Sequence, residues 1–214
     1  HTAYAFSAIL SIVFTILGWA LTPFLLKLID TPADTLADSI LYLRIYFLGI
    51  FGTLIFNIGS AIMRSIGDSR RPLYYLIVCC FLNIILDLVL VIVFDMGIVG
   101  AAIATIISQA VSAILVTNAL MKKYDDCKLY LSKLHIDLLK LRMEFRIGIP
   151  SALQAFMYSI TNIIIQAAIN GFGTDTAAAW ASFGKLDALF WTVNGAFGIA
   201  ITTFAGQNYG AGKK

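Results

Sequence analysis

Residues 78–94 read VCCFLNIILDLVLVIVF, and the run is apolar except for Asn83 and Asp87. Together with its flanks it extends from about residue 72 to 94, which is longer than the roughly 18 apolar residues that indicate a membrane-spanning helix. A carboxylate is costly inside a bilayer, so a residue such as Asp87 within such a run is a candidate functional group. The stretch therefore predicts a transmembrane helix that carries a site.

Five further apolar blocks accompany this one. The 214 residues are 60% hydrophobic and only 13% charged, whereas a soluble domain carries about 25% charged residues. The six blocks cover approximately residues 3–28, 36–63, 72–94, 97–121, 146–171 and 176–206. We predict an all-α, polytopic membrane protein with six transmembrane helices.

Basic residues gather in three regions that join or follow these blocks, around 64–71, 122–146 and 213–214. If the blocks alternate across the membrane, all three regions lie on one side, and the other side collects Asp30, Asp34, Asp38, Asp95 and Asp175. Short basic loops stay in the cytoplasm. We therefore predict a multi-pass protein of the plasma membrane with both ends of this chain cytoplasmic. The basic residues then contact the lipid bilayer and do not indicate a nucleic-acid partner.

The longest connection, 122–145, differs from the other loops in its pattern. Apolar residues recur in it every three or four positions among charged ones: Leu131, Leu134, Leu138, Leu141 and Phe145. This periodicity predicts an amphipathic helix on the inner membrane face. We interpret 122–145 as a cytoplasmic linker between four helices of one bundle (1–121) and two of a second (146–214). Two helices are too few for a bundle, so the chain is expected to be an excerpt of a larger protein.

Four ionisable residues fall inside the apolar blocks: Arg44, Asp87, Lys185 and Asp187. Arg44 is near enough to a helix end for its side chain to reach the head groups. Asn83 lies one helical turn from Asp87, so an amide and a carboxylate share a face that would suit a proton or a small cation. Spacing alone supports equally well an Asp87 that joins helices by hydrogen bonds.

The fifth block carries a series of polar residues spaced by four: Gln154, Tyr158, Asn162, Gln166 and Asn170. Hydrogen bonds between helices account for one or two such residues, whereas five in succession favour contact with a polar cavity. In the sixth block, Lys185 and Asp187 are two residues apart and point in different directions. Each of them therefore needs its own partner or a water-filled cavity.

No motif of a catalytic or metal site is evident. The three cysteines, Cys79, Cys80 and Cys127, have neither metal-ligand spacing nor a disulfide framework, and His1 and His135 form no cluster with them in sequence. The glycine-rich GQNYGAGKK at 206–214 lacks the spacing of a phosphate-binding loop. We expect a protein that is not an enzyme and that holds no cofactor or metal.

Several longer motifs resemble one family in their order. AIMRSIGDSRRPLYYLIVCCFLNIILDLVLVIVFDMGIVGAAIATIISQ at 61–109 is similar to the central N-lobe sequence of multidrug and toxic compound extrusion (MATE) transporters. GIPSALQAFMYSITNIIIQAAINGFGTDTAAAW, GKLDALFW and TTFAGQNYGAGK, within 148–213, resemble the start of that family's C-lobe. The resemblance implies a twelve-helix, two-lobe protein of which this chain carries spans three to eight.

The resemblance also implies a site. In relatives an N-lobe cation site uses an aspartate of the first helix, an Asn-x-x-x-Asp pair on the fifth and a threonine on the sixth. Asn83 and Asp87 match the pair, and Thr105 in GAAIAT matches the threonine. The implied coupling ion is H+ or Na+, with Na+ the only metal ion expected, at Asp87. Tyr158 stands where some sodium-coupled members have a C-lobe glutamate, which argues against a sodium site there.

The function implied is a secondary antiporter that exports organic, often cationic, drug-like compounds by alternating access. Its substrate cleft would include Gln154, Tyr158, Asn162 and Asp187, and its partners are the bilayer and the helices absent from this chain. A lipid-linked precursor flippase of the same superfamily is one alternative, although such a flippase should have more cationic groups in its spans. An intramembrane enzyme and a fragment without transport activity are the others.

Overall fold

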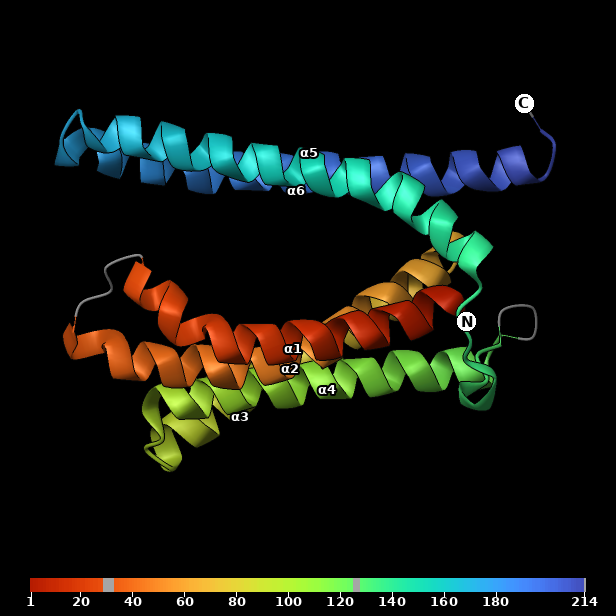
Figure 1. The fold of residues 1–214 in the computed structure, drawn as a ribbon, viewed down its shortest axis with the longest axis horizontal. Helices are drawn as coiled ribbons and strands as arrows, with labels where there is room; N and C mark the ends of the chain where they lie inside the picture. The colour runs from red at the N-terminus through yellow and green to blue at the C-terminus, as the bar shows by residue number, and fades with distance from the viewer. Residues whose placement is uncertain (29–32, 125–127, 214) are drawn as a thin grey trace. The chain divides into compact units, whose positions relative to one another are not determined.

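The computed structural model describes residues 1–28, 33–124 and 128–213 (Figure 1). Asp30, Cys127 and Lys214 lie outside the described residues, as do the side chains of Asp34, Asn170 and Asp175. The fold is all-α, as predicted, and no strand occurs in the described ranges. Six of the helical segments are long and apolar enough to cross a membrane, in agreement with the six blocks of the sequence.

The helices follow the predicted blocks but several are longer. In chain order the elements are α1 (Thr2–Leu28), α2 (Ala33–Ser65), α3 (Arg70–Asp87), the π-helix η1 (Leu88–Val93), α4 (Gly97–Lys122), the 3₁₀ turn η2 (Leu131–Lys133), α5 (Leu138–Asn170) and α6 (Thr174–Gly210). The chain divides into two compact units, residues 1–137 and 138–214.

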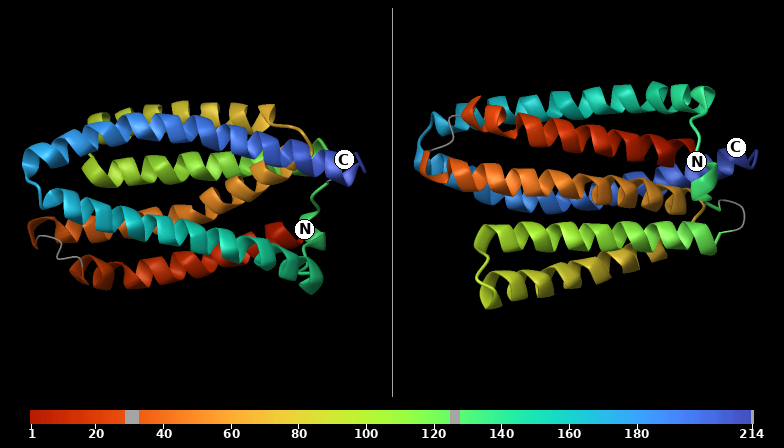
Figure 2. Two further views of the ribbon diagram at one scale, coloured as in Figure 1. Left: turned by 90° about the horizontal axis from the view of Figure 1, so that it is seen from above. Right: turned by 60° about the horizontal axis from the view of Figure 1, so that its bottom comes forward.

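The first unit is a four-helix layer in which the spatial order differs from the chain order. Helix α2 packs against α1 on one side and against α4 on the other, and α3 packs on α4 (Figures 1 and 2). Its core lies between α2 and α4, where Ile55, Met63, Val116 and Leu120 are fully or almost fully buried. Within a bilayer, such side chains hold helices together by van der Waals packing, because the surrounding lipid is itself apolar.

A cluster of polar groups joins the α2–α3 loop to the end of α4. Tyr124 donates a hydrogen bond to the Asp68 carboxylate, and Arg71 forms an ion pair with the same carboxylate at 3.1 Å. The Arg71 guanidinium also lies over the Tyr124 ring, 5.1 Å from its centroid. Burial by itself would raise the pKa of Asp68, but the bonds from Tyr124 and Arg71 outweigh it and hold that pKa below its ordinary value.

The segment expected to form an amphipathic helix is divided between the two units at Asp137. Leu129 is buried and its N–H donates to the carbonyl of Leu120 at 3.0 Å, and Leu134 packs against the core. Helical structure in 128–137 is limited to the turn η2, and the next helix, α5, begins at Leu138. The expected periodicity is thus divided, because Leu134 packs against the core and Leu138, Leu141 and Phe145 belong to α5. A position of this segment on the membrane surface stays a prediction.

The second unit is a hairpin of two long helices. Helices α5 and α6 lie side by side and are joined by a turn at 171–173, in which Gly173 has φ +100°. Almost all described side chains of this unit are exposed, including large apolar ones such as Phe156, Ile163 and Phe204. Apolar exposure on this scale fits helices that meet lipid or other helices.

Candidate functional site

Asp87 lies where α3 changes from α-helix to π-helix. The following segment, η1, has the wider hydrogen bonding in which the N–H of Phe94 donates to the carbonyl of Val89, five residues earlier, at 3.0 Å. Asp95 then adopts φ +52° and begins the turn into α4. π-Helical turns are rare and often occur at functional sites. The sequence does not reveal this irregularity, because 88–93 is uniformly apolar.

Asn83 and Asp87 both have a buried polar atom without a hydrogen-bond partner. The atoms are Nδ2 of Asn83 and Oδ1 of Asp87, and no described protein group satisfies either of them. An unpaired buried polar group costs several kcal/mol, and a charged one costs more. A proton or a small cation on the Asp87 carboxylate would remove the cost of that group, whereas Nδ2 of Asn83 is a donor and requires an acceptor oxygen.

The predicted pair and threonine only partly share one pocket. A pocket of about 350 Å³ between α2, α3 and α4 is lined by both Asn83 and Thr105, whereas Asp87 is not among its lining residues. The hydroxyl of Thr105 donates to the carbonyl of Ala101 at 3.0 Å, which leaves its oxygen as an acceptor toward the pocket. The structure therefore brings Asn83 and Thr105 together, with Asp87 one helical turn beyond Asn83.

The other predicted residues belong to the second unit. Gln154, Tyr158 and Asn162 are exposed along α5, and Asp187 is half-buried on α6. Among the described residues, no hydrogen bond or ion pair joins Asp187 to these three or to the exposed Lys185. Each unit thus carries its own polar groups.

Known proteins similar to this chain give a consistent identity. The family model MatE matches residues 1–89. The probable multidrug resistance protein YpnP of Bacillus subtilis is 30% identical over 96% of this chain and 46% of its own length. The chain belongs to the MATE family. YoeA, a second probable multidrug resistance protein of B. subtilis, is 28% identical over 98% of the chain and 47% of its own length.

Solved MATE structures have the same fold. The crystal structure of a MATE protein in its bent conformation superposes with a TM-score of 0.90 at 26% identity, over 98% of this chain and 47% of that chain. This chain therefore spans about half the length of the MATE proteins that it matches. Its six apolar helices and this membership identify a multi-pass membrane protein.

The pocket also contains polar residues that the sequence analysis missed. Thr53 and Asn57 of α2 and Ser108, Gln109 and Ser112 of α4 line it together with Asn83 and Thr105. A usable signal was present, since these residues recur at three- and four-residue spacing within apolar blocks. They supply further oxygen and amide groups, so the site in this MATE chain is more polar than its carboxylate alone indicates.

Arg44 contacts an aromatic ring of the neighbouring helix, whereas its side chain was expected to reach the lipid head groups. Its guanidinium lies over the ring of Trp19 on α1, 4.4 Å from the centroid, while its Nε is buried without a hydrogen bond from the described residues. A cation over an indole ring is stabilised by about 0.5–2 kcal/mol, depending on how far it is desolvated. Arg44 therefore joins α1 to α2 within the spans.

The described residues do not indicate a metal site built from several protein side chains. No group of three or more His, Cys, Asp or Glu side chains that could hold a metal ion occurs there. Cys79 and Cys80 are free thiols on α3. A cation bound beside Asn83 and Asp87 would therefore be held by one carboxylate and by neutral oxygen atoms.

Proposed function

We propose that the full-length protein containing this chain is a secondary antiporter that exports organic, often cationic, compounds in exchange for H+ or Na+ by alternating access. Membership of the MATE family and the multidrug-resistance names of its relatives support export over lipid flipping or enzymatic chemistry. The observation that carries the proposal is the buried, unpartnered carboxylate oxygen of Asp87 within a membrane span.

The coupling ion would bind at Asn83, Asp87 and Thr105. With Asp87 ionised and no cation bound, a buried charge is left unpaired, and a proton or Na+ removes that cost. Two helix arrangements that differ in access to Asp87 would then differ in affinity for the ion, so the ion gradient would bias one arrangement over the other. The π-helical turn after Asp87 and the polar pocket beside Asn83 support a site of this kind.

The exported compound would contact Gln154, Tyr158, Asn162 and Asp187. Amide and phenol groups on α5 suit the polar parts of varied drug-like molecules, and a carboxylate on α6 attracts cations. Residues 1–121 would belong to one lobe and 146–214 to the other, with 122–145 between them. The basic regions support an orientation in the plasma membrane with the linker and both chain ends in the cytoplasm.

The test is Asp87→Asn in the full-length protein reconstituted into liposomes with an imposed pH or Na+ gradient. We expect gradient-driven ethidium efflux to fall to background while expression and folding stay near wild type, because an amide cannot exchange a proton or neutralise Na+. Asp95→Asn, which removes an exposed carboxylate a short distance along the chain, is the matched control. Wild-type efflux by a well-folded Asp87→Asn protein would exclude Asp87 from coupling.

A further inference from the structure

A groove lies between α1, α2, α4 and the segment around η2, in the part of the first unit where α1 begins and α4 ends. It has a volume of about 540 Å³, within the range of sites for organic ligands. Most of its lining is apolar and comes from all four elements: Ala8, Phe51, Ile114, Met121, Leu131 and Leu134. Phe51 and Ile114 are exposed, so the groove is open along one side.

The groove and the polar pocket between α2, α3 and α4 occupy opposite faces of α2. Phe51 and Ile55 line the groove, whereas Thr53 and Asn57 line the polar pocket. Two residues in sequence correspond to about 200° around a helix. Polar side chains within a span face the protein interior or water, so the apolar face that carries the groove is the one left to lipid.

The hydroxyl groups of the groove have partners within the protein. Thr117 donates to the carbonyl of Ala113 at 2.6 Å, and its oxygen accepts from the buried hydroxyl of Tyr4, also at 2.6 Å, because a threonine has a single proton to donate. Asn118 is the one amide among the described lining residues, and it is exposed. The interior of the groove therefore offers apolar contacts, as an acyl chain requires.

Two lysine side chains gather next to Leu131, at one end of the groove. Nζ of Lys133 lies 5.0 Å from the centre of the Tyr130 ring, and Nζ of Lys128 lies 5.8 Å from it. An ammonium group near a ring face is attracted by the ring, so Tyr130 holds both cations at one place. Among the residues that the structure describes, no ion pair joins either lysine to a carboxylate.

Hydrogen bonds hold this segment against the start of α1. The N–H of Tyr130 donates to Nε2 of His1 at 3.2 Å. The hydroxyl of Thr2 accepts from the N–H of Asp137 at 3.2 Å and donates to the carbonyl of His135 at 3.4 Å. Because Nε2 of His1 is an acceptor, that ring is neutral, and the positive charge beside Tyr130 is the charge of the two lysines.

The other charged groups at this end do not reverse that sign. Lys122 and Lys123 at the end of α4 are followed by Asp125 and Asp126, which lie outside the described residues. Asp137 is the one acidic residue of 128–137, and it is half-buried and engaged in further interactions. The start of α1 and the end of α4 meet here with helix dipoles of opposite sign. The site beside Tyr130 therefore favours an anion.

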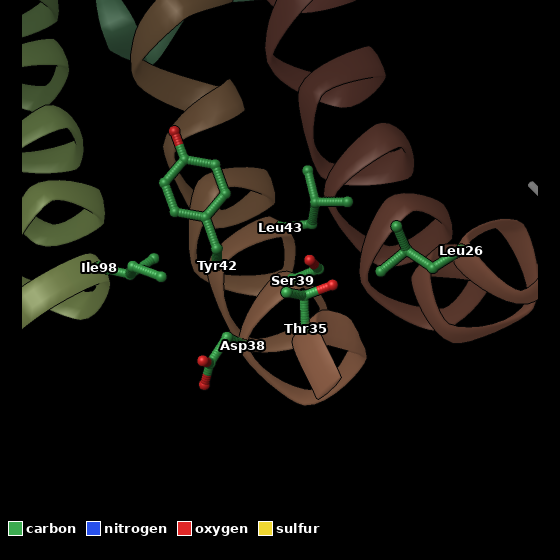
Figure 3. Close-up of a pocket in the computed structure, with 7 residues that line it drawn as sticks. All are labelled: Leu26, Thr35, Asp38, Ser39, Tyr42, Leu43 and Ile98. Carbon is green, nitrogen blue, oxygen red and sulfur yellow. The ribbon is translucent and has the colours of Figure 1, made fainter. Parts of the chain in front are cut away.

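The pocket at the opposite end of the first unit lacks such a pair of cations. It is lined by Leu26, Asp38 and Tyr42 among others (Figure 3), and its charged lining residue is a carboxylate, with Lys27 next to Leu26 in the last turn of α1. Figure 3 shows the Asp38 carboxylate directed away from the Tyr42 ring. The combination of an apolar groove with two convergent ammonium groups is thus a property of one end of the unit.

We propose that the groove and the two lysines form a docking site for one anionic phospholipid. An acyl chain lies in the groove, and the phosphate binds the ammonium groups of Lys128 and Lys133. Tyr130 suits this position because tyrosine is enriched at the level of the head groups. In the proposed topology the lipid belongs to the inner leaflet, whose anionic lipids attract basic segments next to spans. The bound lipid would hold 128–137 against α1 and α4.

The experiment measures lipid contact at the groove itself. Asn118→Cys in the full-length protein, with the native cysteines replaced by alanine, is labelled with bimane and reconstituted into dioleoylphosphatidylcholine vesicles. Increasing fractions of phosphatidylglycerol or phosphatidylcholine with brominated chains, which quench bimane on contact, are then included. Each lysine near an anionic head group changes affinity about fivefold. We therefore expect half-maximal quenching at a mole fraction of brominated phosphatidylglycerol that is roughly 5- to 25-fold lower than that of brominated phosphatidylcholine.

Variants separate the head-group site from general surface charge. Lys128→Gln with Lys133→Gln should abolish the preference for phosphatidylglycerol, and arginine at both positions should retain it. Lys122→Gln with Lys123→Gln removes the same charge outside the Tyr130 site and is the matched control, which should keep most of the preference. Bimane at Ser39→Cys, in the pocket at the opposite end, should show no preference for phosphatidylglycerol.

Each contrary result would overturn the proposal. Equal quenching by the two lipids would show that the groove holds any surrounding lipid, and a preference unchanged by the double glutamine variant would place the head group elsewhere. Absence of quenching by both lipids would show that another part of the full-length protein covers the groove. The measurement requires no ion gradient, so this proposal and the proposed export function can fail separately: loss of efflux in Asp87→Asn has no bearing on the quenching.

Discussion

Helices α2 and α4 approach each other so closely at Gly52 that the addition of one methyl group at this residue should push them apart. A Cβ atom at this position would lie 2.9 Å from the carbonyl carbon and oxygen of Gln109 and 3.1 Å from the nitrogen of Ala110. All three are backbone atoms, which cannot rotate aside as the end of a side chain can. Gly52→Ala therefore requires a shift of one helix against the other, in the part of the unit that contains the polar pocket.

The magnitude follows from two opposing effects. Overpacking costs about 1–3 kcal/mol, and contact with backbone places Gly52→Ala in the upper part of that range. Alanine is favoured over glycine in a helix by about 1 kcal/mol. We expect a net loss of about 1–2 kcal/mol in the free energy of unfolding.

The matched control is Gly49→Ala, one turn away on α2. There the nearest atom to the added Cβ is Oε1 of Gln109 at 2.6 Å, the end of a flexible side chain, with Ile106 Cγ1 next at 3.1 Å. Rotation of the Gln109 amide relieves the contact, so stability should stay within about 0.5 kcal/mol of wild type because the helix propensity gain offsets the rearrangement.

SDS-induced unfolding of the purified full-length protein in mixed micelles, followed by circular dichroism, measures both variants. The expected order of stability is wild type close to Gly49→Ala, with Gly52→Ala clearly lower. A Gly52→Ala protein as stable as wild type would refute the close approach of α2 and α4 at this residue.

Three further predictions concern other parts of the chain. Asp187→Asn should reduce the efflux of cations about fivefold more than the efflux of neutral compounds. Asp187→Leu should in addition lower the yield of folded protein. Equal effects of Asp187→Asn on both substrate classes in a transport assay would contradict this prediction. A cysteine in place of Lys133 should react with an impermeant maleimide only from the cytoplasmic side in intact cells and inverted vesicles, and labelling from outside alone would reverse the proposed topology. The lowered pKa of Asp68 stabilises the folded state above the carboxyl's unfolded-state pKa of about 3.9, and this contribution is lost as the pH falls through the lower folded-state value. Tyr124→Phe removes the hydrogen bond to Asp68, which is one cause of the lowered pKa. The free energy of unfolding of this variant should therefore fall less than that of wild type between neutral pH and pH 3. Parallel curves of stability against pH for the two proteins would show that the Tyr124 hydrogen bond does not lower the pKa of Asp68.

The local properties of the chain determined its helices and one pair of functional candidates. The length of each apolar block is enough to predict a transmembrane helix, because a backbone in lipid must satisfy its hydrogen bonds within the segment. The four-residue spacing of Asn83 and Asp87 places both side chains on one face of the helix, because residues four apart in sequence are neighbours on a helix surface. Thr105 was found only by family resemblance, because nothing in its own segment distinguishes it from the other small polar residues of α4.

Tertiary structure alone decided which faces meet. The association of Asn83 with Thr53, Asn57 and Gln109 depends on the order α1–α2–α4–α3 across the first unit, and on the close approach that Gly52 permits between α2 and α4. The linker shows the same limit, because the periodicity of 131–145 is compatible with a surface helix as well as with a leucine packed onto the core of its own unit and three apolar residues on the next helix. The periodicity of a sequence shows which face of a helix is apolar. Which other helix covers that face depends on contacts between segments far apart in the chain, and these contacts form only when the helices pack.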